Sequence, residues 1–147
     1  MPKVDDIVIR QATIALHKSI CQIAKQSPYT KDFSNKIFSG EDCYDAGRVR
    51  VLFVDTKLVG FSCFRFRKRG RVLVLYFIGV ESDYRGKGYG EVLMDDLWAY
   101  SQGVIELKVM KDNRATNLYT RLGYTKVGEA YDGKAWVLRA QKETPAG

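Results

Sequence analysis

The spacing of hydrophobic residues predicts a chain that alternates between strands and helices. An apolar run at 7–9 is typical of a short opening strand. Apolar residues then recur every three or four positions over 16–24, which predicts a helix, and Pro28 ends it because a proline disfavours helical backbone in the residue before it. A weaker helical pattern covers 30–38, and the composition of 40–47 predicts a loop.

The rest of the chain continues this alternation and places the centre of a sheet. The segment Val72–Val80 is uncharged and apolar on both faces, as in a strand covered on both sides, and it is too short to span a bilayer as a helix. The remaining pattern predicts strands at 49–53, 58–66, 104–109, 124–127 and 134–138, with helices at 91–100 and 115–122. This order indicates an α/β or α+β fold with a mixed sheet of about seven strands and about four helices.

Composition narrows the class of protein. The chain has 147 residues, of which 46% are hydrophobic and 28% charged, and this balance indicates one soluble globular domain over 1–147 and excludes disorder as the main state. Only 142–147 resembles a frayed tail. The first residues contain no basic stretch that leads into an apolar one, so we expect no secretory signal and a cytoplasmic location.

Cysteine and histidine usage predicts neither disulfides nor a metal. Cys21, Cys43 and Cys63 are odd in number and widely spaced, which favours reduced thiols. With His17 as the one histidine, no two-histidine zinc site can form. His17 and Cys21 lie four residues apart on the first helix, where packing is the favoured interpretation over a metal or nucleophilic pair.

Positive charge is concentrated in one predicted hairpin. The formal net charge is +7, and the segment 65–71 carries five cations and no acid: Arg65, Arg67, Lys68, Arg69 and Arg71. Such a segment can bind nucleic acid or an acidic partner through its charges. It can also be a solvated hairpin whose charges keep exposed strands from pairing with other chains, which is the favoured interpretation. The sequence leaves both interpretations open.

A glycine-rich segment follows the central strand. Gly86, Gly88 and Gly90 alternate with other residues, so successive backbone N–H groups can turn toward one anion. The helix that follows adds its positive N-terminal dipole, and Arg85 and Lys87 add charge. These features predict a diphosphate cradle. Neither the Walker pattern nor the dinucleotide fingerprint fits the spacing.

Three segments resemble the GCN5-related N-acetyltransferases. The pattern Arg-x-x-Gly-x-Gly at 85–90 resembles the acetyl-CoA pyrophosphate loop of that family, and 113–124 resembles its N-x-x-A-x-x-x-Y-x-x-x-G-F/Y segment. A weaker match, 55–61, is similar to the hairpin of its second and third strands. The resemblance covers about 7–138 with the element order intact.

The resemblance implies acetyl-CoA as cosubstrate, without a metal. The family holds it in a gap where strands 4 and 5 splay apart, and Ile78 and Val80 would pair with the pantetheine arm through their backbone, with Gly79 as a bulge between them. The implied cofactor-binding set is Ile78, Val80, Arg85, Gly86, Lys87, Gly88, Tyr89, Gly90 and Asn113. Tyr119 matches the family tyrosine that acts as general acid; packing against the sheet is its alternative role.

The general base is where this chain departs from the family. The family's protein-lysine branch has a glutamate eleven residues before the loop, where this chain has Val74. Glu106 is one residue out of phase with the strand-5 glutamate of some N-terminal acetyltransferases. Glu81, Tyr76 or a water chain could serve. Two smaller departures are Ser82 at the usual proline, and Asp112 at the usual asparagine with Asn113 one residue later.

The resemblance implies an acetyl-CoA-dependent N-acetyltransferase whose acceptor is a primary amine of a small molecule or a protein. Acceptor contacts in this fold usually come from the segments that correspond to 25–38 and 131–136. The alternative is a binding protein that uses the hairpin at 65–71 for nucleic acid or an acidic partner, and a combined interpretation has the hairpin recruit a macromolecular acceptor. We expect no membrane association, and either a monomer or a homodimer.

Overall fold

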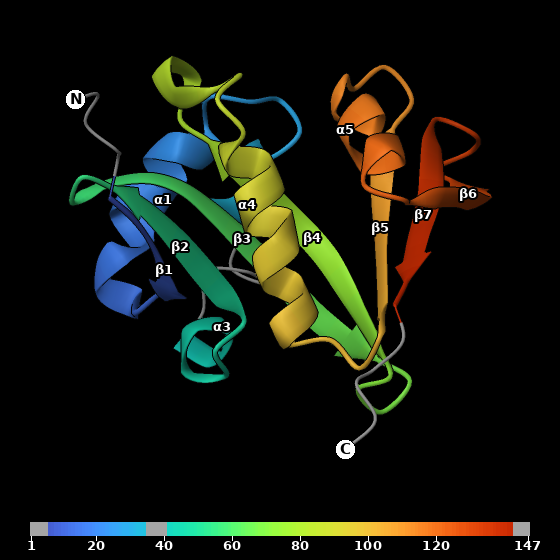
Figure 1. Cartoon of the computed structure of the whole chain (residues 1–147), viewed down its shortest axis with the longest axis horizontal. Helices are drawn as coiled ribbons and strands as arrows, with labels where there is room; N and C mark the ends of the chain where they lie inside the picture. Colours follow the sequence, from blue (N-terminus) through green and yellow to red (C-terminus); the bar gives the residue numbers. More distant parts are fainter. Residues whose placement is uncertain (1–5, 35–40, 143–147) are drawn as a thin grey trace. The chain divides into compact units, whose positions relative to one another are not determined.

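The computed structural model describes residues 6–34 and 41–142, and its strands form a seven-stranded mixed sheet in the order β1-β2-β3-β4-β5-β7-β6 (Figure 1). The strands are β1 (Ile7–Gln11), β2 (Val49–Val54), β3 (Lys57–Arg67), β4 (Val72–Val80), β5 (Val104–Met110), β6 (Thr125–Ala130) and β7 (Ala135–Gln141). The helices are α1 (His17–Ala24), α3 (Glu41–Asp45), α4 (Tyr89–Asp96) and α5 (Ala115–Arg121), with 3-10 turns at Ile14–Leu16, Lys31–Ser34, Ser82–Tyr84 and Leu97–Ala99. The predicted fold class is confirmed.

The central position predicted for Val72–Val80 is also confirmed, since β4 is the fourth strand of the seven. It pairs in parallel with β5, and the ladder comprises three residue pairs, from Leu73↔Ile105 to Leu75↔Leu107. β5 and β6 both pair antiparallel with β7. The parallel pair requires a crossover connection, which α4 provides between β4 and β5.

The chain forms two compact units. The first comprises residues up to Cys63 together with Phe77–Leu93, and the second comprises Phe64–Tyr76 together with the chain from Met94 onward. β3 and β4 each contribute residues to both units. The single-domain boundary of 1–147 stays a prediction, and the predicted frayed tail lies outside the described residues from position 143.

Aromatic rings form the centre of the first unit. The ring of Phe33 lies 5.0 Å from that of Phe61 and 5.5 Å from that of Phe77, and α1 adds its buried face. At the rim, the Sγ of Cys21 lies 3.4 Å from Nε2 of His17, whose Nδ1 lies 2.6 Å from the Tyr44 hydroxyl. Burial lowers the pKa of His17. The His17–Cys21 pair therefore packs against core side chains, as the favoured interpretation has it.

One predicted loop is a helix. We expect a loop at 40–47 from its composition, but α3 occupies Glu41–Asp45 and buries Cys43 and Tyr44 in the core. It ends in a Schellman motif, in which Gly47 at φ +71° donates to the Tyr44 carbonyl and Arg48 donates to the Cys43 carbonyl. The helix forms because its buried residues and its glycine cap outweigh the polar composition. Of the helical pattern over 30–38, the 3-10 turn Lys31–Ser34 is seen, and 35–38 lie outside the described residues.

Three further features bear on function. Cys21, Cys43 and Cys63 are all buried and form no disulfide with one another. Within 6–34 and 41–142, no helix is long and apolar enough to cross a membrane.

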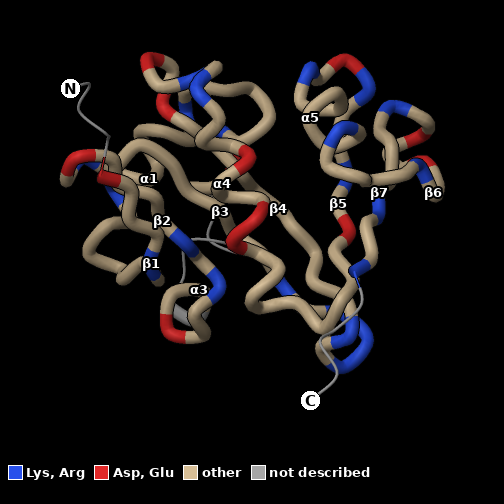
Figure 2. The backbone as a smooth tube through the Cα atoms, in the orientation of Figure 1, with Lys and Arg blue, Asp and Glu red and all other residues tan. Residues whose placement is uncertain are grey.

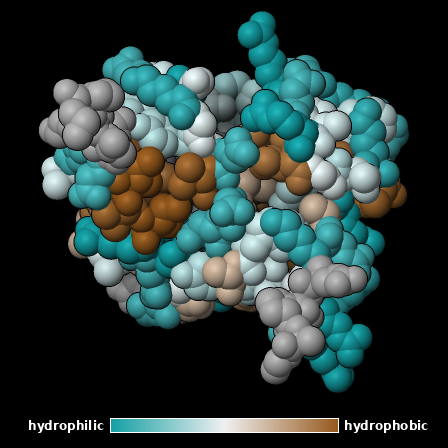
Figure 3. Space-filling view, viewed as in Figure 1, coloured by the Kyte–Doolittle hydropathy of each residue, from teal (hydrophilic) through white to brown (hydrophobic). Residues whose placement is uncertain are grey.

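The edge strand β1 exposes 43% of Ile7 and 45% of Val8, and Figure 3 shows hydrophobic surface over the part of the molecule where β1 and β2 lie.

Candidate functional site

The glycine-rich segment leaves β4 in the first unit and turns into α4. A 3-10 turn at Ser82–Tyr84 follows the strand, and Gly86 and Gly88 then adopt φ values of +78° and +89° before α4 begins at Tyr89. A Cβ atom built on either glycine meets nothing within 4 Å. The requirement for glycine is therefore one of backbone handedness, and the space above the turn is open to a ligand.

Arg85 fastens this loop to the rest of the unit. Its Nε donates to the Val80 carbonyl at 3.0 Å, and one terminal nitrogen donates to the Gln26 carbonyl at 3.4 Å. The Ser82 N–H donates in turn to the side-chain oxygen of Gln26 at 2.8 Å. The guanidinium thus orders the loop and keeps its charge, exposed, beside the two glycines. Sequence reasoning predicts the charge; the ordering contact with α1's C-terminal turn comes from the structure.

Two lysines flank Tyr84 at the same loop. The Nζ of Lys87 lies 5.4 Å and that of Lys57 5.1 Å from the centre of the tyrosine ring. Lys57 also pairs with Glu81 at 3.2 Å, and the hydrogen bond to that carboxylate raises the pKa of the lysine. Glu81, one of the candidate bases, is therefore engaged with a cation.

The side chains of Ile78, Val80 and Tyr89 face the core. Tyr89 is buried in a cluster with Leu52, Val54, Val59 and Leu93, and Ile78 and Val80 pack against the same cluster. Because these side chains pack inward, we expect a contact with a cofactor to come from the backbone, as the family resemblance implies for Ile78 and Val80. Gly90 lies in the first turn of α4, so the loop and the helix are continuous.

Gly79 has a packing role within the first unit. A Cβ atom at this position would lie 2.8 Å from Cε1 of Phe61, closer than any real contact. The glycine therefore makes room for a core ring that the neighbouring strand contributes. The predicted bulge at this residue stays a prediction.

The second matched segment forms α5 and the turn before it, in the second unit. Asn113 accepts a 2.9 Å hydrogen bond from the Ala115 N–H through its side-chain oxygen and so caps the helix. Tyr119 is buried, and its ring meets that of Tyr124 edge-on at 5.9 Å. Burial raises the pKa of Tyr119, so its hydroxyl keeps its proton near neutral pH. A protonated hydroxyl is the form that a general acid needs.

Glu106 is occupied by two arginines. One oxygen accepts from Arg67 at 2.7 Å, and the other accepts from Arg139 at 2.7 Å and 3.2 Å. Burial alone would raise the pKa of Glu106, but the hydrogen bonds from Arg139 and Arg67 outweigh it and hold that pKa below its ordinary value. A carboxylate so engaged is a poor proton acceptor, which supports setting it aside as the base. Sequence reasoning missed this cluster, because only the β5–β7 register places Arg139 opposite Glu106.

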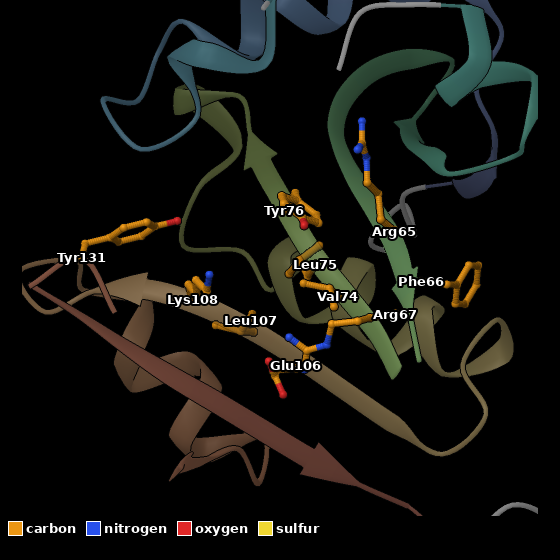
Figure 4. Close-up of a pocket in the computed structure, with 10 residues that line it drawn as sticks. All are labelled: Arg65, Phe66, Arg67, Val74, Leu75, Tyr76, Glu106, Leu107, Lys108 and Tyr131. Atoms are coloured by element: carbon orange, nitrogen blue, oxygen red, sulfur yellow. Dashed lines mark hydrogen bonds and ion pairs between the residues drawn. The ribbon is translucent and has the colours of Figure 1, made fainter. Parts of the chain in front are cut away.

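A pocket of about 330 Å³ lies beside this cluster, within the second unit (Figure 4). β3 contributes Arg65 and Arg67, β4 contributes Tyr76, and β5 contributes Glu106 and Lys108. Tyr131 lies on the turn between β6 and β7 and its side chain also lines the pocket. Tyr76, another candidate base, thus lines a pocket, with 49% of its surface exposed.

The family model of the acetyltransferase (GNAT) family matches residues 14–124. The chain belongs to this family. A curated relative, the 5-NmdU N-acetyltransferase of Pseudomonas phage PaMx11, is 42% identical over 135 residues, which cover 90% of this chain and 96% of the relative. This GNAT protein is accordingly an N-acetyltransferase, and acetyl transfer to an amine is consistent with every comparison.

Solved structures agree on the fold of this GNAT enzyme. The PaiA N-acetyltransferase of Thermoplasma acidophilum in complex with coenzyme A has a TM-score of 0.77 at 17% identity and covers 93% of this chain and 99% of its own. Ard1 of Thermoplasma volcanium has a TM-score of 0.76 at 20% identity, with coverage of 94% and 99%. The yncA protein of Salmonella typhimurium with its cofactor acetyl-CoA has a TM-score of 0.73 at 18% identity, with coverage of 97% of each chain.

Proposed function

We propose that this enzyme transfers an acetyl group from acetyl-CoA to a primary amine carried by a modified deoxyuridine. The observation that supports this acceptor is the relative named 5-NmdU N-acetyltransferase. The two chains are 42% identical over a match that covers 96% of the relative. We interpret that acceptor as a deoxyuridine with an aminomethyl group on its base. The choice of acetyl-CoA is supported by the structural neighbours that hold coenzyme A or acetyl-CoA.

The loop in the first unit suits the diphosphate of acetyl-CoA. It combines two left-handed glycines, the exposed charges of Arg85 and Lys87 and the first turn of α4. We assign to the cofactor the backbone of Ile78, Val80, Tyr89 and Gly90, the loop residues Arg85, Gly86, Lys87 and Gly88, and the turn at Asn113. The amide nitrogen of Asn113 is the part of its side chain left for this role, because the oxygen caps α5.

The chemistry is direct attack by a neutral amine on the thioester carbonyl. The new C–N bond forms as the C–S bond breaks, so the amine must lose a proton and the thiolate must gain one. Tyr119 is assigned the donation of this proton to the sulfur, as the family resemblance implies. The base is Glu81, Tyr76 or a water chain, of which Glu81 is already paired with Lys57. A cytoplasmic location and a monomeric or dimeric state remain predictions.

The test is an acetylation assay with matched acceptors. The protein is incubated with acetyl-CoA and 5-aminomethyl-deoxyuridine, as the nucleoside and within an oligodeoxynucleotide, and the free thiol of released CoA is measured. Mass spectrometry then shows whether one acetyl group is gained. Thymidine and its oligonucleotide, which lack the amine, serve as controls. Thiol release with lysine peptides or polyamines but with neither aminomethyl substrate would refute this acceptor while leaving the family activity in place.

A further inference from the structure

The pocket in the second unit carries two tyrosines, and a cation faces each of them. The guanidinium carbon of Arg65 lies 5.9 Å from the centre of the Tyr76 ring, and the Nζ of Lys108 lies 5.5 Å from the centre of the Tyr131 ring. Figure 4 shows Tyr131 directed toward the side of the pocket where Lys108 and Tyr76 lie. Aromatic rings and cations gathered in one pocket suit a ligand that is itself flat and anionic.

Strand alternation places these polar side chains on one face of the sheet. Along β5, Glu106 and Lys108 alternate with the buried Ile105, Leu107 and Val109. The register pairs Glu106 with Val74 on β4, two residues before Tyr76, and with Arg139 on β7. Side chains two residues apart on a strand share a face. The polar side chains of β4 and β5 that line the pocket therefore lie on one face of this part of the sheet, next to the apolar Val74, Leu75 and Leu107 that also line it.

Arg67 holds a defined position within that face. The buried Glu106 accepts from it at 2.7 Å and is anchored from the other side by Arg139. One carboxylate thus serves two guanidinium groups, and Arg65 and Lys108 add two more cations to the same pocket. The positive charge of the pocket exceeds its negative charge, and Arg67 is held in place by a hydrogen-bonded ion pair.

Tyr131 occupies left-handed backbone. It has a φ of +55° and exposes 60% of its surface, at the turn beside the pocket. Left-handed backbone is uncommon for a bulky residue, and exposure of a large ring gains no burial energy. Asp132 has a φ of +56°, so the two residues form the centre of the hairpin turn between β6 and β7, where such backbone is usual. The turn thereby presents the exposed ring of Tyr131 at the rim of the pocket.

The basic hairpin extends the pocket at its β3–β4 end. Lys68, Arg69 and Arg71 are exposed, and Figure 2 shows Lys and Arg gathered at this turn. A single nucleotide would use the cations within the pocket. The additional cations on the adjoining turn suit further phosphates along a strand, because each phosphate of a nucleic acid adds one negative charge.

We propose that this pocket binds the acceptor nucleotide as part of a DNA strand, with the base against Tyr76 and Tyr131 and its phosphates on Arg65 and Arg67. Phosphates of the adjoining nucleotides lie along Lys68, Arg69 and Arg71. The choice of a deoxynucleotide rests on the proposed function; the flat, anionic character of the ligand rests on the pocket itself. Arg139 and Glu106 are positioning residues that hold Arg67.

The experiment measures DNA binding without acetyl-CoA, so that it is separate from catalysis. Fluorescence anisotropy follows a labelled single-stranded oligodeoxynucleotide as it binds to the full chain. We expect Tyr76→Leu and Tyr131→Leu each to weaken binding about tenfold through lost stacking. Arg65→Gln should reduce the slope of log affinity against log salt by about 0.7 for each phosphate contact that it removes.

Two matched variants control for fold and charge. Tyr100→Leu replaces another exposed tyrosine of the second unit that does not line the pocket. Lys18→Gln removes one exposed positive charge from α1. Thermal unfolding of every variant separates a loss of binding from a loss of fold. Binding that drops as much in Tyr100→Leu and Lys18→Gln as in the pocket variants would overturn the proposal.

Three further results of the binding experiment also test the proposal. A mononucleotide that binds as tightly as the oligonucleotide would overturn the proposal of a DNA strand, because it has no adjoining phosphates to place on Lys68, Arg69 and Arg71. Polyglutamate that competes as well as DNA would overturn the proposal, because it carries charge without flat bases. DNA binding that responds to the pocket variants, together with no acetylation of an aminomethyl oligonucleotide, would sustain the pocket and refute the proposed acceptor.

Discussion

Phe61 occupies the space that a side chain on Gly79 would need, since a Cβ atom there would lie 2.8 Å from Cε1 of the ring. Phe61 is fully buried in β3, and Gly79 lies near the end of β4, the strand to which the pantetheine arm is assigned. The contact between Phe61 and Gly79 therefore affects both the packing of the core and the strand that is proposed to bind the cofactor.

Gly79→Ala should destabilise the protein by about 1–3 kcal/mol, because the added methyl group overpacks the core against Phe61. Urea unfolding measures this. The double variant Gly79→Ala with Phe61→Leu should be more stable than the sum of the two single changes predicts, since the smaller side chain gives the methyl group room. Strict additivity of the two free-energy changes would show that this contact does not require the glycine.

Gly88→Val should abolish measurable binding of acetyl-CoA in isothermal titration. The residue has a φ of +89°, which costs a β-branched residue about 1–2 kcal/mol, and the side chain would project into the open space above the turn. Gly88→Asn should bind more strongly than Gly88→Val, because asparagine tolerates left-handed backbone. Gly128→Ala is the control, since its Cβ would lie 4.0 Å from that of Val137. Normal affinity in Gly88→Val would remove the loop from the cofactor site.

Tyr119→Phe should lower turnover about a hundredfold while the affinity for CoA changes little, because the hydroxyl acts on the leaving thiolate. The matched control is Tyr124→Phe. Its hydroxyl is buried and has no hydrogen-bond partner among the described residues, so its removal should leave turnover unchanged. Steady-state kinetics and titration with CoA separate the two effects. Equal turnover in Tyr119→Phe and the wild type would leave Tyr119 with a packing role only.

Ionisation of the two tyrosines should also limit stability in alkali. Burial raises the pKa of both Tyr119 and Tyr124 above the ordinary value of 10.0. The folded state therefore binds protons more tightly than the unfolded state, and its stability is complete below pH 10 and falls as the pH rises beyond it. Thermal unfolding against pH checks this, and Tyr119→Phe with Tyr124→Phe should flatten the alkaline decline.

Glu106 should make the protein sensitive to acid. Its pKa lies below the ordinary value of 4.5, because hydrogen bonds from Arg139 and Arg67 outweigh the burial that would raise it. The stability that it contributes is present above pH 4.5 and is lost as the pH falls toward the lowered pKa of the folded state. Glu106→Gln should cost about 2 kcal/mol at neutral pH and weaken this acid dependence. An unchanged acid limb in the variant would mean that other carboxylates govern it.

Much of the fold could be predicted from the sequence because its signals are local. The apolar run from Val72 to Val80 matches β4 residue for residue, and the glycine-rich loop lies between β4 and α4 as expected. The expected loop at 40–47 is wrong because the burial of Cys43 and Tyr44 depends on contacts with distant parts of the chain.

The candidate site likewise has features that the sequence predicts and features that depend on the three-dimensional structure. The charge on Arg85 and Lys87 follows from residue type, whereas the ion pairs of Glu106 depend on the register of β5 with β7 and on the position of Arg67 on β3. No hairpin turn joins β5 to β7, so the register of this pair cannot be read from a turn in the sequence. The sequence therefore predicts the cofactor loop but not the pocket, whose residues come from three strands and one turn.

The turn between β3 and β4 keeps its charge at the expense of stability. Lys68 and Arg69 have φ values of +54° and +58°, and each loses about 1 kcal/mol that glycine or asparagine would not lose there. A turn selected only for folding would carry those smaller residues. Engineering this enzyme for heat resistance by relaxing the turn would therefore remove two cations along with the strain, and a more stable enzyme could prove a weaker one on a charged acceptor.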